Sequence, residues 1–252
     1  MAQRAAEKKR KKSERSWAVV NGLAAFFFAG LMAFAGYQGI VHPDTPLPRA
    51  WNPTEPLRIN DPVTWITGWK LSRAVATEEK CLATLDGFAA LQSLSPREDS
   101  EQCFIRDRVD LRAVGQARLS PVETRCAIAL RMAMWEQHSL QPAAAEYLGT
   151  TVSSIDHFGS YSCRVMRTAS GPSTRMSTHA TADAIDIAGF GLSDGTRIRL
   201  LADWGPAGPK ADFLRAVRDG ACDWFSLTLS PDYNRLHADH FHLQSRGWGL
   251  CR

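Results

Sequence analysis

The sequence has 252 residues, of which 44% are hydrophobic and 22% are charged, so it is neither a disordered chain nor a wholly membranous one. The formal net charge is +4, but residues 4–15 alone hold seven basic and two acidic residues. The rest of the chain carries 23 basic and 24 acidic residues, so we expect no large basic face and no nucleic-acid partner.

An apolar segment follows the basic run. Residues 17–41 contain no Asp, Glu, Lys or Arg, and about 20 apolar residues in a helix span the hydrocarbon core of a bilayer. Lys and Arg beside such a helix hold their flank in the cytoplasm. We therefore predict a basic cytoplasmic segment at residues 1–16 and a transmembrane anchor at residues 17–41. A cleavable signal peptide is the alternative, because Ala33-Phe34-Ala35 resembles a cleavage site.

A proline-rich segment comes next. Residues 42–62 hold six of the 13 prolines, which fix the backbone and remove hydrogen-bond donors. We predict a proline-rich linker at residues 42–62 that leads to one exported domain at residues 63–252. The alternative is that Trp51 and Leu57 dock this segment onto the domain.

Helical patterns precede strand patterns in this domain. Residues 64–94 read as helical, and Ser120-Pro121-Val122-Glu123 offers an N-cap, a first-turn proline and a capping-box acid for a helix that runs to about Gln137. We predict an α+β fold, with helices concentrated before a small, mainly antiparallel sheet and packed on it. The predicted strands are residues 151–155, 162–166, 182–187, 196–202, 225–229 and 237–243, with a helix near residues 210–218 between them.

Six cysteines lie beyond the apolar segment: Cys81, Cys103, Cys126, Cys163, Cys222 and Cys251. Their even number predicts three disulfides in an oxidising compartment, and no pair has the Cys-x-x-Cys spacing of a metal site. Six cysteines allow fifteen pairings. Proximity in the chain suggests Cys81–Cys103, Cys126–Cys163 and Cys222–Cys251.

Four of the seven histidines fall in two short stretches, residues 177–187 and 236–243. Together the two stretches hold His179, Asp183, Asp186, His237, Asp239, His240 and His242. Residues two apart in a strand share a face, so His240 and His242 would project into one space with Phe241 behind them. A strand at Asp186 could bring its carboxylate to the same point.

Two imidazoles and one carboxylate leave a fourth tetrahedral position for water, which is how catalytic zinc sites are built. Zinc lowers the pKa of that water toward 7 and polarises a carbonyl, so the group suits amide hydrolysis. The alternative is that these histidines are ordinary polar side chains.

The two stretches resemble a known group of enzymes. Ser-x-His-x-x-(Gly/Ala)-x-Ala-x-Asp-Ile followed by Asp-His-x-His is similar to the zinc peptidases that include D-Ala-D-Ala carboxypeptidases, the vancomycin-resistance D-Ala-D-Ala dipeptidase and the penicillin-insensitive murein endopeptidase. Residues from about Cys81 to Arg252 more closely resemble the bacterial extensin-like C-terminal domain family. That resemblance includes residues 159–164 and Cys251-Arg252.

The resemblance implies that His179, Asp186 and His242 bind Zn²⁺. His237 and His240 match additional active-site histidines of the murein endopeptidase. Asp239 occupies the place where the dipeptidase branch has its acidic base. We rank His240 first as the base and Asp239 second, either as the base or as a partner that orients a histidine.

Arg164 resembles an arginine that holds the substrate or the developing oxyanion, and a surface salt bridge is its alternative role. We therefore expect a zinc-dependent peptidoglycan peptidase, an endopeptidase or a carboxypeptidase. The chain would cross the inner membrane once and place its C-terminal domain in the periplasm, against peptidoglycan peptides. The alternatives are a hydrolase of another substrate and a non-catalytic wall-binding or envelope scaffold that retains the metal site.

Overall fold

The structure is a computed structural model that describes residues 2–42, 44–168, 171–205 and 207–252. The chain divides into two compact units, Met1–Glu55 and Pro56–Arg252. The hydrophobic core begins at Leu57, and all three disulfides lie in the second unit, so this unit has what it needs to fold by itself.

The first unit is dominated by one helix, α1 (Ala2–Val41). Its segment Ser16–Val41 has a mean hydropathy of 2.0 and is long and apolar enough to cross a membrane. By length and composition this helix could serve as a single membrane span or as a signal sequence. A short 3-10 turn, η1 (Arg49–Trp51), follows, and the Asn52 side chain donates a hydrogen bond of 3.0 Å to the Ile40 carbonyl.

The second unit begins with two helices, α2 (Thr67–Ala74) and α3 (Glu78–Leu85). The helix predicted for residues 64–94 is therefore wrong as one element. Thr77 starts a new helix, since its side chain accepts a hydrogen bond from the Lys80 amide. Gly87 then has a φ of 71°, which turns the chain into a strand, β1 (Ala89–Ser93).

A nine-stranded sheet forms the centre of this unit. Its strand order is β1, β4, β5, β6, β9, β12, β11 and β13, and β10 pairs with β9. The bounds are β4 (Arg108–Val114), β5 (Ala117–Arg125), β6 (Val152–Gly159), β9 (Ala184–Leu192), β10 (Arg197–Arg199), β11 (Leu227–Leu229), β12 (Phe241–Gln244) and β13 (Leu250–Cys251). Only the β5–β6 and β11–β13 pairs are parallel among the described strands, which confirms the predicted α+β fold with a mainly antiparallel sheet.

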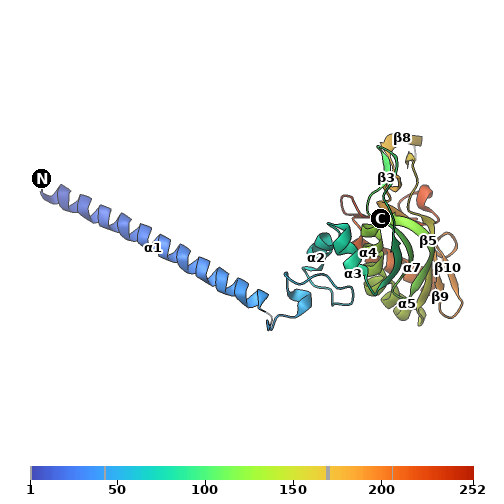
Figure 1. Ribbon diagram of the computed structural model, residues 1–252, viewed down its shortest axis with the longest axis horizontal. Coiled ribbons are helices and arrows are strands. Elements are labelled where there is room, and N and C mark those ends of the chain that lie inside the picture. Colours follow the sequence, from blue (N-terminus) through green and yellow to red (C-terminus); the bar gives the residue numbers. More distant parts are fainter. Residues whose placement is uncertain (1, 43, 169–170, 206) are drawn as a thin grey trace. The chain divides into compact units, whose positions relative to one another are not determined.

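Two small hairpins stand apart from this sheet. One pairs β2 (Arg97–Ser100) with β3 (Cys103–Ile105), and the other pairs β7 (Val165–Thr168) with β8 (Gly171–Met176). β3 and β8 lie at the same end of the unit (Figure 1).

Helices that follow β5 in the chain complete the core: α4 (Cys126–Trp135), the single π-helical turn η2 (Glu136–Leu140), α5 (Gln141–Leu148), α6 (Leu200–Asp203) and α7 (Pro209–Trp224). The Trp135 indole donates to the Val217 carbonyl at 2.9 Å and its ring lies 6.0 Å from that of Phe190 on β9. Trp135 thus joins α4, α7 and the sheet. Five strands precede α4, so the helices are not concentrated before the sheet.

The helix start predicted at Ser120 is wrong, because Ser120 to Glu123 lie in β5 and α4 begins at Cys126. The pairing of β4 with β5 is irregular between Leu111, which faces Val122, and Ala113, which faces Arg118. Pro121 falls in this irregular stretch, where a strand tolerates the missing N–H. Strand pairing here overrides the local capping signal.

Most other predicted strands are close to the observed ones. β6, β9, β11 and β12 fall on the runs predicted from residues 151, 182, 225 and 237. β12 starts later than predicted, because residues Arg235–His237 form a 3-10 turn, η4. Predicted strand 196–202 ends as helix α6, and predicted strand 162–166 overlaps β7 only at its end.

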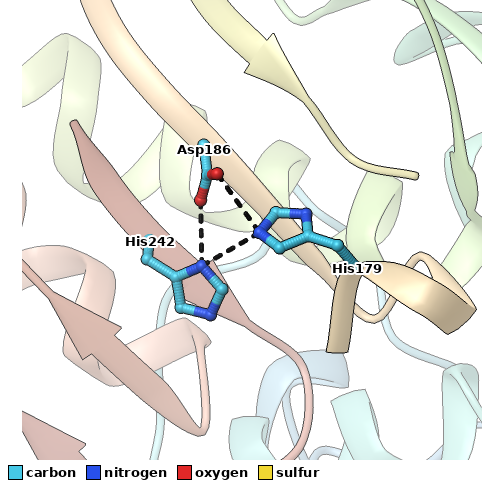
Figure 2. Close-up of side chains that lie close together, drawn as sticks. All are labelled: His179, Asp186 and His242. Atoms are coloured by element: carbon cyan, nitrogen blue, oxygen red, sulfur yellow. Dashed lines mark hydrogen bonds and ion pairs between the residues drawn. The ribbon is translucent and has the colours of Figure 1, made fainter. Parts of the chain in front are cut away.

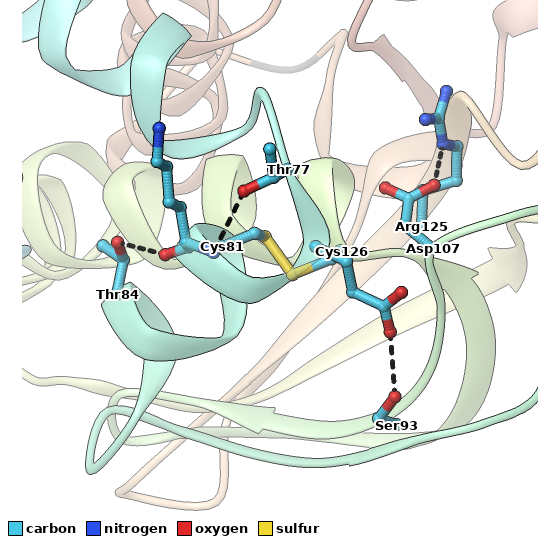
Figure 3. The surroundings of a disulfide bond; sticks show 9 residues. Thr77, Cys81, Thr84, Ser93, Asp107, Arg125 and Cys126 are labelled. Atoms are coloured by element: carbon cyan, nitrogen blue, oxygen red, sulfur yellow. Dashed lines mark hydrogen bonds and ion pairs between the residues drawn. A yellow bond between two sulfur atoms is a disulfide. The ribbon is translucent and has the colours of Figure 1, made fainter.

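The three predicted disulfides are present, but two of the suggested pairings are wrong. The bridges are Cys81–Cys126, Cys103–Cys163 and Cys222–Cys251. Figure 3 shows the first bridge, which joins α3 to the first residue of α4. Distance along the chain fails as a guide because strands β1 to β5 lie between Cys81 and Cys126 in sequence and fold back to bring them together.

Part of the predicted linker packs into the second unit. Leu57 and Ile59 belong to the hydrophobic core, and the His138 ring donates from Nε2 to the Ile59 carbonyl at 2.7 Å. The chain is therefore anchored to the second unit from Leu57 onward.

Candidate metal centre

Strands β9 and β12 place two of the predicted ligands opposite each other. His242 pairs with Asp186, and its neighbours Phe241 and Leu243 pair with Ile187 and Ile185. The four neighbours are buried in the core, so the strand alternation turns His242 and Asp186 to the other face of the sheet. Phe241 packs behind His242, as predicted.

A tight turn supplies the third residue. η3 (Thr178–Thr181) begins after β8, and the Ser177 hydroxyl caps it by accepting a hydrogen bond from the His179 amide. The turn ends at Ala182, whose φ of 49° is left-handed and returns the chain to β9. A residue without a large side chain suits this conformation.

The three side chains converge, as Figure 2 shows. His179 Nε2 lies 3.2 Å from His242 Nδ1 and 3.2 Å from Asp186 Oδ2, and His242 Nδ1 lies 2.9 Å from Asp186 Oδ1. Ligand atoms about 2.0–2.1 Å from a tetrahedral zinc ion stand about 3.3–3.4 Å apart. The group is close to that spacing before any ion is added, so its residues could hold a metal ion.

Hydrogen bonds on the far side of each ring set its orientation. His179 Nδ1 donates to the Ser160 carbonyl at 2.8 Å, which leaves Nε2 directed at Asp186. His242 Nε2 donates to Gln244 Oε1 at 3.3 Å, which leaves its Nδ1 for the group. Thr178 also donates to Gln244 Oε1, at 3.0 Å. Sequence reasoning assigned no role to Gln244, although its position two residues after His242 in a strand could have suggested one.

The electrostatics keep Asp186 ionised. Burial raises the pKa of this carboxyl, but hydrogen bonds and charge from His179 and His242 outweigh burial and hold the pKa well below its usual range. A carboxylate is the form that binds a metal ion.

Two further predicted histidines border the group. His240 Nε2 lies 3.7 Å from Asp186 Oδ1, and its Nδ1 donates to Asp239 Oδ1 at 2.8 Å. The His237 ring lies 5.2 Å from that of His240, and its Nδ1 donates to Asn234 Oδ1 at 2.9 Å. Burial, together with His240 and His242, lowers the pKa of His237 to about 4, so its ring is neutral at neutral pH.

Asp239 and Arg164 differ in how closely they approach the group. Asp239 is half exposed and contacts the group through His240, as an orienting partner would. The Arg164 backbone carbonyl accepts from the Ser177 amide at 3.0 Å, beside the turn that holds His179. Its guanidinium donates to the neighbouring Val165 carbonyl at 3.4 Å, and no described contact joins it to the three-residue group.

A buried carboxylate anchors the turn. Asp183 is 1% exposed and pairs with Arg125 at 2.7 Å and with Arg246 at 2.6 Å. It also accepts from the Thr181 hydroxyl at 2.5 Å. Asp183 therefore holds the turn after His179 in place.

Residues 79–252 match the protein family described as extensin-like protein C-terminus. The match includes every candidate site residue and all six cysteines. No curated protein matches the chain. No solved structure matches it either.

Proposed function

This chain belongs to the extensin-like protein C-terminus family, and from that premise we propose that its Pro56–Arg252 unit is a zinc-dependent peptidase of peptidoglycan. The observation that carries the proposal is the convergence of His179, Asp186 and His242 on the face of the sheet opposite the core residues Phe241 and Leu243, with His240 beside them. The likeness of both histidine motifs to zinc peptidases supports it.

The donor set suits zinc. Two neutral imidazoles and one carboxylate are common zinc ligands and leave one tetrahedral position open. A zinc ion held there would supply a Lewis acid for the substrate carbonyl and would lower the pKa of a coordinated water. The Asp186 side chain is 14% exposed and that of His242 is 12% exposed, so the group is recessed but reachable.

His240 is suited to move the proton. Its Nδ1 donates to Asp239, so its Nε2 carries the lone pair and lies 3.7 Å from Asp186 Oδ1, beside the group that would hold the ion. We assign His240 as the general base that takes a proton from the attacking water and passes it to the leaving amine. Asp239 fixes the tautomer of His240 and stabilises its charged form.

His237 and Arg164 have binding roles in this proposal. With Nδ1–H bound to Asn234, the neutral His237 ring offers Nε2 as an acceptor for a substrate N–H. Arg164 offers a guanidinium fork for a substrate carboxylate or the developing oxyanion.

The proposed location follows from α1 and the disulfides. α1 would cross the inner membrane once, and three disulfides favour an oxidising compartment such as the periplasm. Peptidoglycan is accessible from that side.

The test is to purify the Pro56–Arg252 unit with its disulfides formed, together with His242→Ala and with His157→Ala as a matched control. His157 bonds the Ser120 carbonyl on the neighbouring strand and lies outside the three-residue group. Elemental analysis measures bound metal, and chromatography measures the muropeptides released from purified peptidoglycan.

We expect one zinc per chain and cleavage in the parent and in His157→Ala, and neither in His242→Ala. Zinc binding without cleavage would replace the peptidase by a wall-binding scaffold. Absence of bound metal would show that the site assignment is wrong.

A further inference from the structure

An aromatic side chain stands exposed beside the metal centre. Phe158 on β6 is 62% exposed, and its ring lies 5.8 Å from the His240 ring in an edge-on arrangement. Large apolar side chains on a sheet normally face the core, so this exposure needs a cause.

The cause is a β-bulge. On β6, His157 pairs with Ile187 and Gly159 pairs with Asp186, although Ile187 and Asp186 are adjacent. Phe158 is therefore an extra residue without a partner in the ladder. Gly159 next to it has a φ of 108°, which an L side chain rarely adopts. Bulges redirect a side chain next to functional sites, and this one lies directly across from Asp186.

Phe158 also begins a row of rings. The ring of His240 lies 5.2 Å from that of His237, which in turn lies 5.5 Å from the ring of Tyr233. Tyr233 is 43% exposed, so the two outer rings of the row are open to a ligand. The His237 ring lies 6.0 Å from the ring of His242, so the row runs alongside the metal centre.

We propose that Phe158 is a substrate-contact residue that packs against an apolar side chain of the bound peptide, close to the bond that is cut. This inference rests on the proposed function. The Phe158 ring has no polar atom, so the group it meets presents C–H surface. An extended peptide advances roughly 3.3–3.6 Å per residue, so a ring 5.8 Å from His240 reaches a side chain within about two residues of the bond.

A peptide is favoured over a sugar for one geometric reason. His240 is the proposed base for the amide, so the part of the substrate that Phe158 can reach is the peptide that flanks this amide. A sugar ring that stacks on Phe158 is the alternative, and the experiment separates the two.

The experiment measures binding apart from cleavage. The metal-free Pro56–Arg252 unit is sedimented with intact peptidoglycan and with glycan strands from which the peptides have been removed. The variants are Phe158→Ala and Phe158→Leu, and the matched control is Trp65→Ala. Trp65 is 82% exposed and precedes α2, in a different part of the unit. Zinc-loaded samples are then tested for cleavage.

We expect the parent to prefer peptide-bearing material, and Phe158→Ala to weaken that binding about tenfold. Phe158→Leu should retain part of the binding, and Trp65→Ala should match the parent. Zinc content should be unchanged in all three variants.

Unchanged binding by Phe158→Ala would overturn the inference, and so would an equal loss on both materials, which would indicate a sugar contact. A parent that shows no preference for peptide-bearing material would also overturn it. If binding depends on Phe158 but the zinc-loaded parent cleaves nothing, the peptidase is refuted and the Phe158 contact stands. If Phe158→Ala binds and cleaves as the parent does, the peptidase stands and the Phe158 contact is refuted.

Discussion

Gln244 should control how tightly the metal centre holds its ion. Its Oε1 accepts from His242 Nε2 at 3.3 Å. This bond holds the ring proton on Nε2, so Nδ1, which faces Asp186, remains available to bind a metal ion. Gln244→Leu removes this acceptor and leaves the largely buried Nε2–H of His242 without a partner. The ring can then place its proton on Nδ1, where it no longer binds a metal ion. Loss of such a partner weakens metal binding about 10–100-fold, or about 1.4–2.7 kcal/mol.

The assay is competition for zinc between the Pro56–Arg252 unit and a chelating dye of known affinity. Gln92→Leu is the matched control, since Gln92 is exposed on β1. Gln244→Glu keeps an acceptor oxygen and should retain tight binding. A zinc affinity of Gln244→Leu within about twofold of the parent, with native thermal unfolding, would refute the role given to Gln244.

Three further predictions concern the base, the core and a disulfide. His240→Ala should keep one zinc per chain but lower kcat about 10²–10⁴-fold, and loss of the zinc in this variant would instead make His240 a ligand. Burial raises the pKa of Glu136, despite opposing hydrogen bonds from Gln141 and the Gln116 amide. Its contribution to stability is therefore full below about pH 4 and is lost as pH rises through the folded pKa. Glu136→Gln should gain stability relative to the parent as pH rises above about 4, measured by urea unfolding. A pH-independent difference would contradict this. Joint replacement of Cys81 and Cys126 by Ala should cost about 2–5 kcal/mol of unfolding free energy, and a cost below about 1 kcal/mol would show that the bridge matters little.

Strand alternation made much of the centre predictable. Alternation in the second stretch predicted that His242 faces the site with Phe241 behind it, and a strand at Asp186 was expected to bring its carboxylate to the same point, as the register of β9 and β12 does. His240 was expected to share this face through a regular strand. It comes near Asp186 instead from the residue before β12, after the turn η4.

Features that depend on pairing between distant segments were not predictable. Pro121 and Glu123 are typical of a helix start, yet both lie in β5 because this segment pairs with β4. The bulge at Phe158 arises from the register of β6 against β9, and the local sequence marks it only by the neighbouring Gly159. The pairing of Cys103 with Cys163 likewise depends on where the two small hairpins lie.

The strand that carries His242 also joins two parts of the sheet. β12 lies between β9 and β11, so its pairing connects β11 and β13 to the strands from β1 to β9. Without that pairing, Asp186 is left with His179 but without the imidazole of His242. The pairing of β12 with β9 therefore completes both the sheet and the three-residue group. Any change that weakens this pairing should disturb the group as well as the fold.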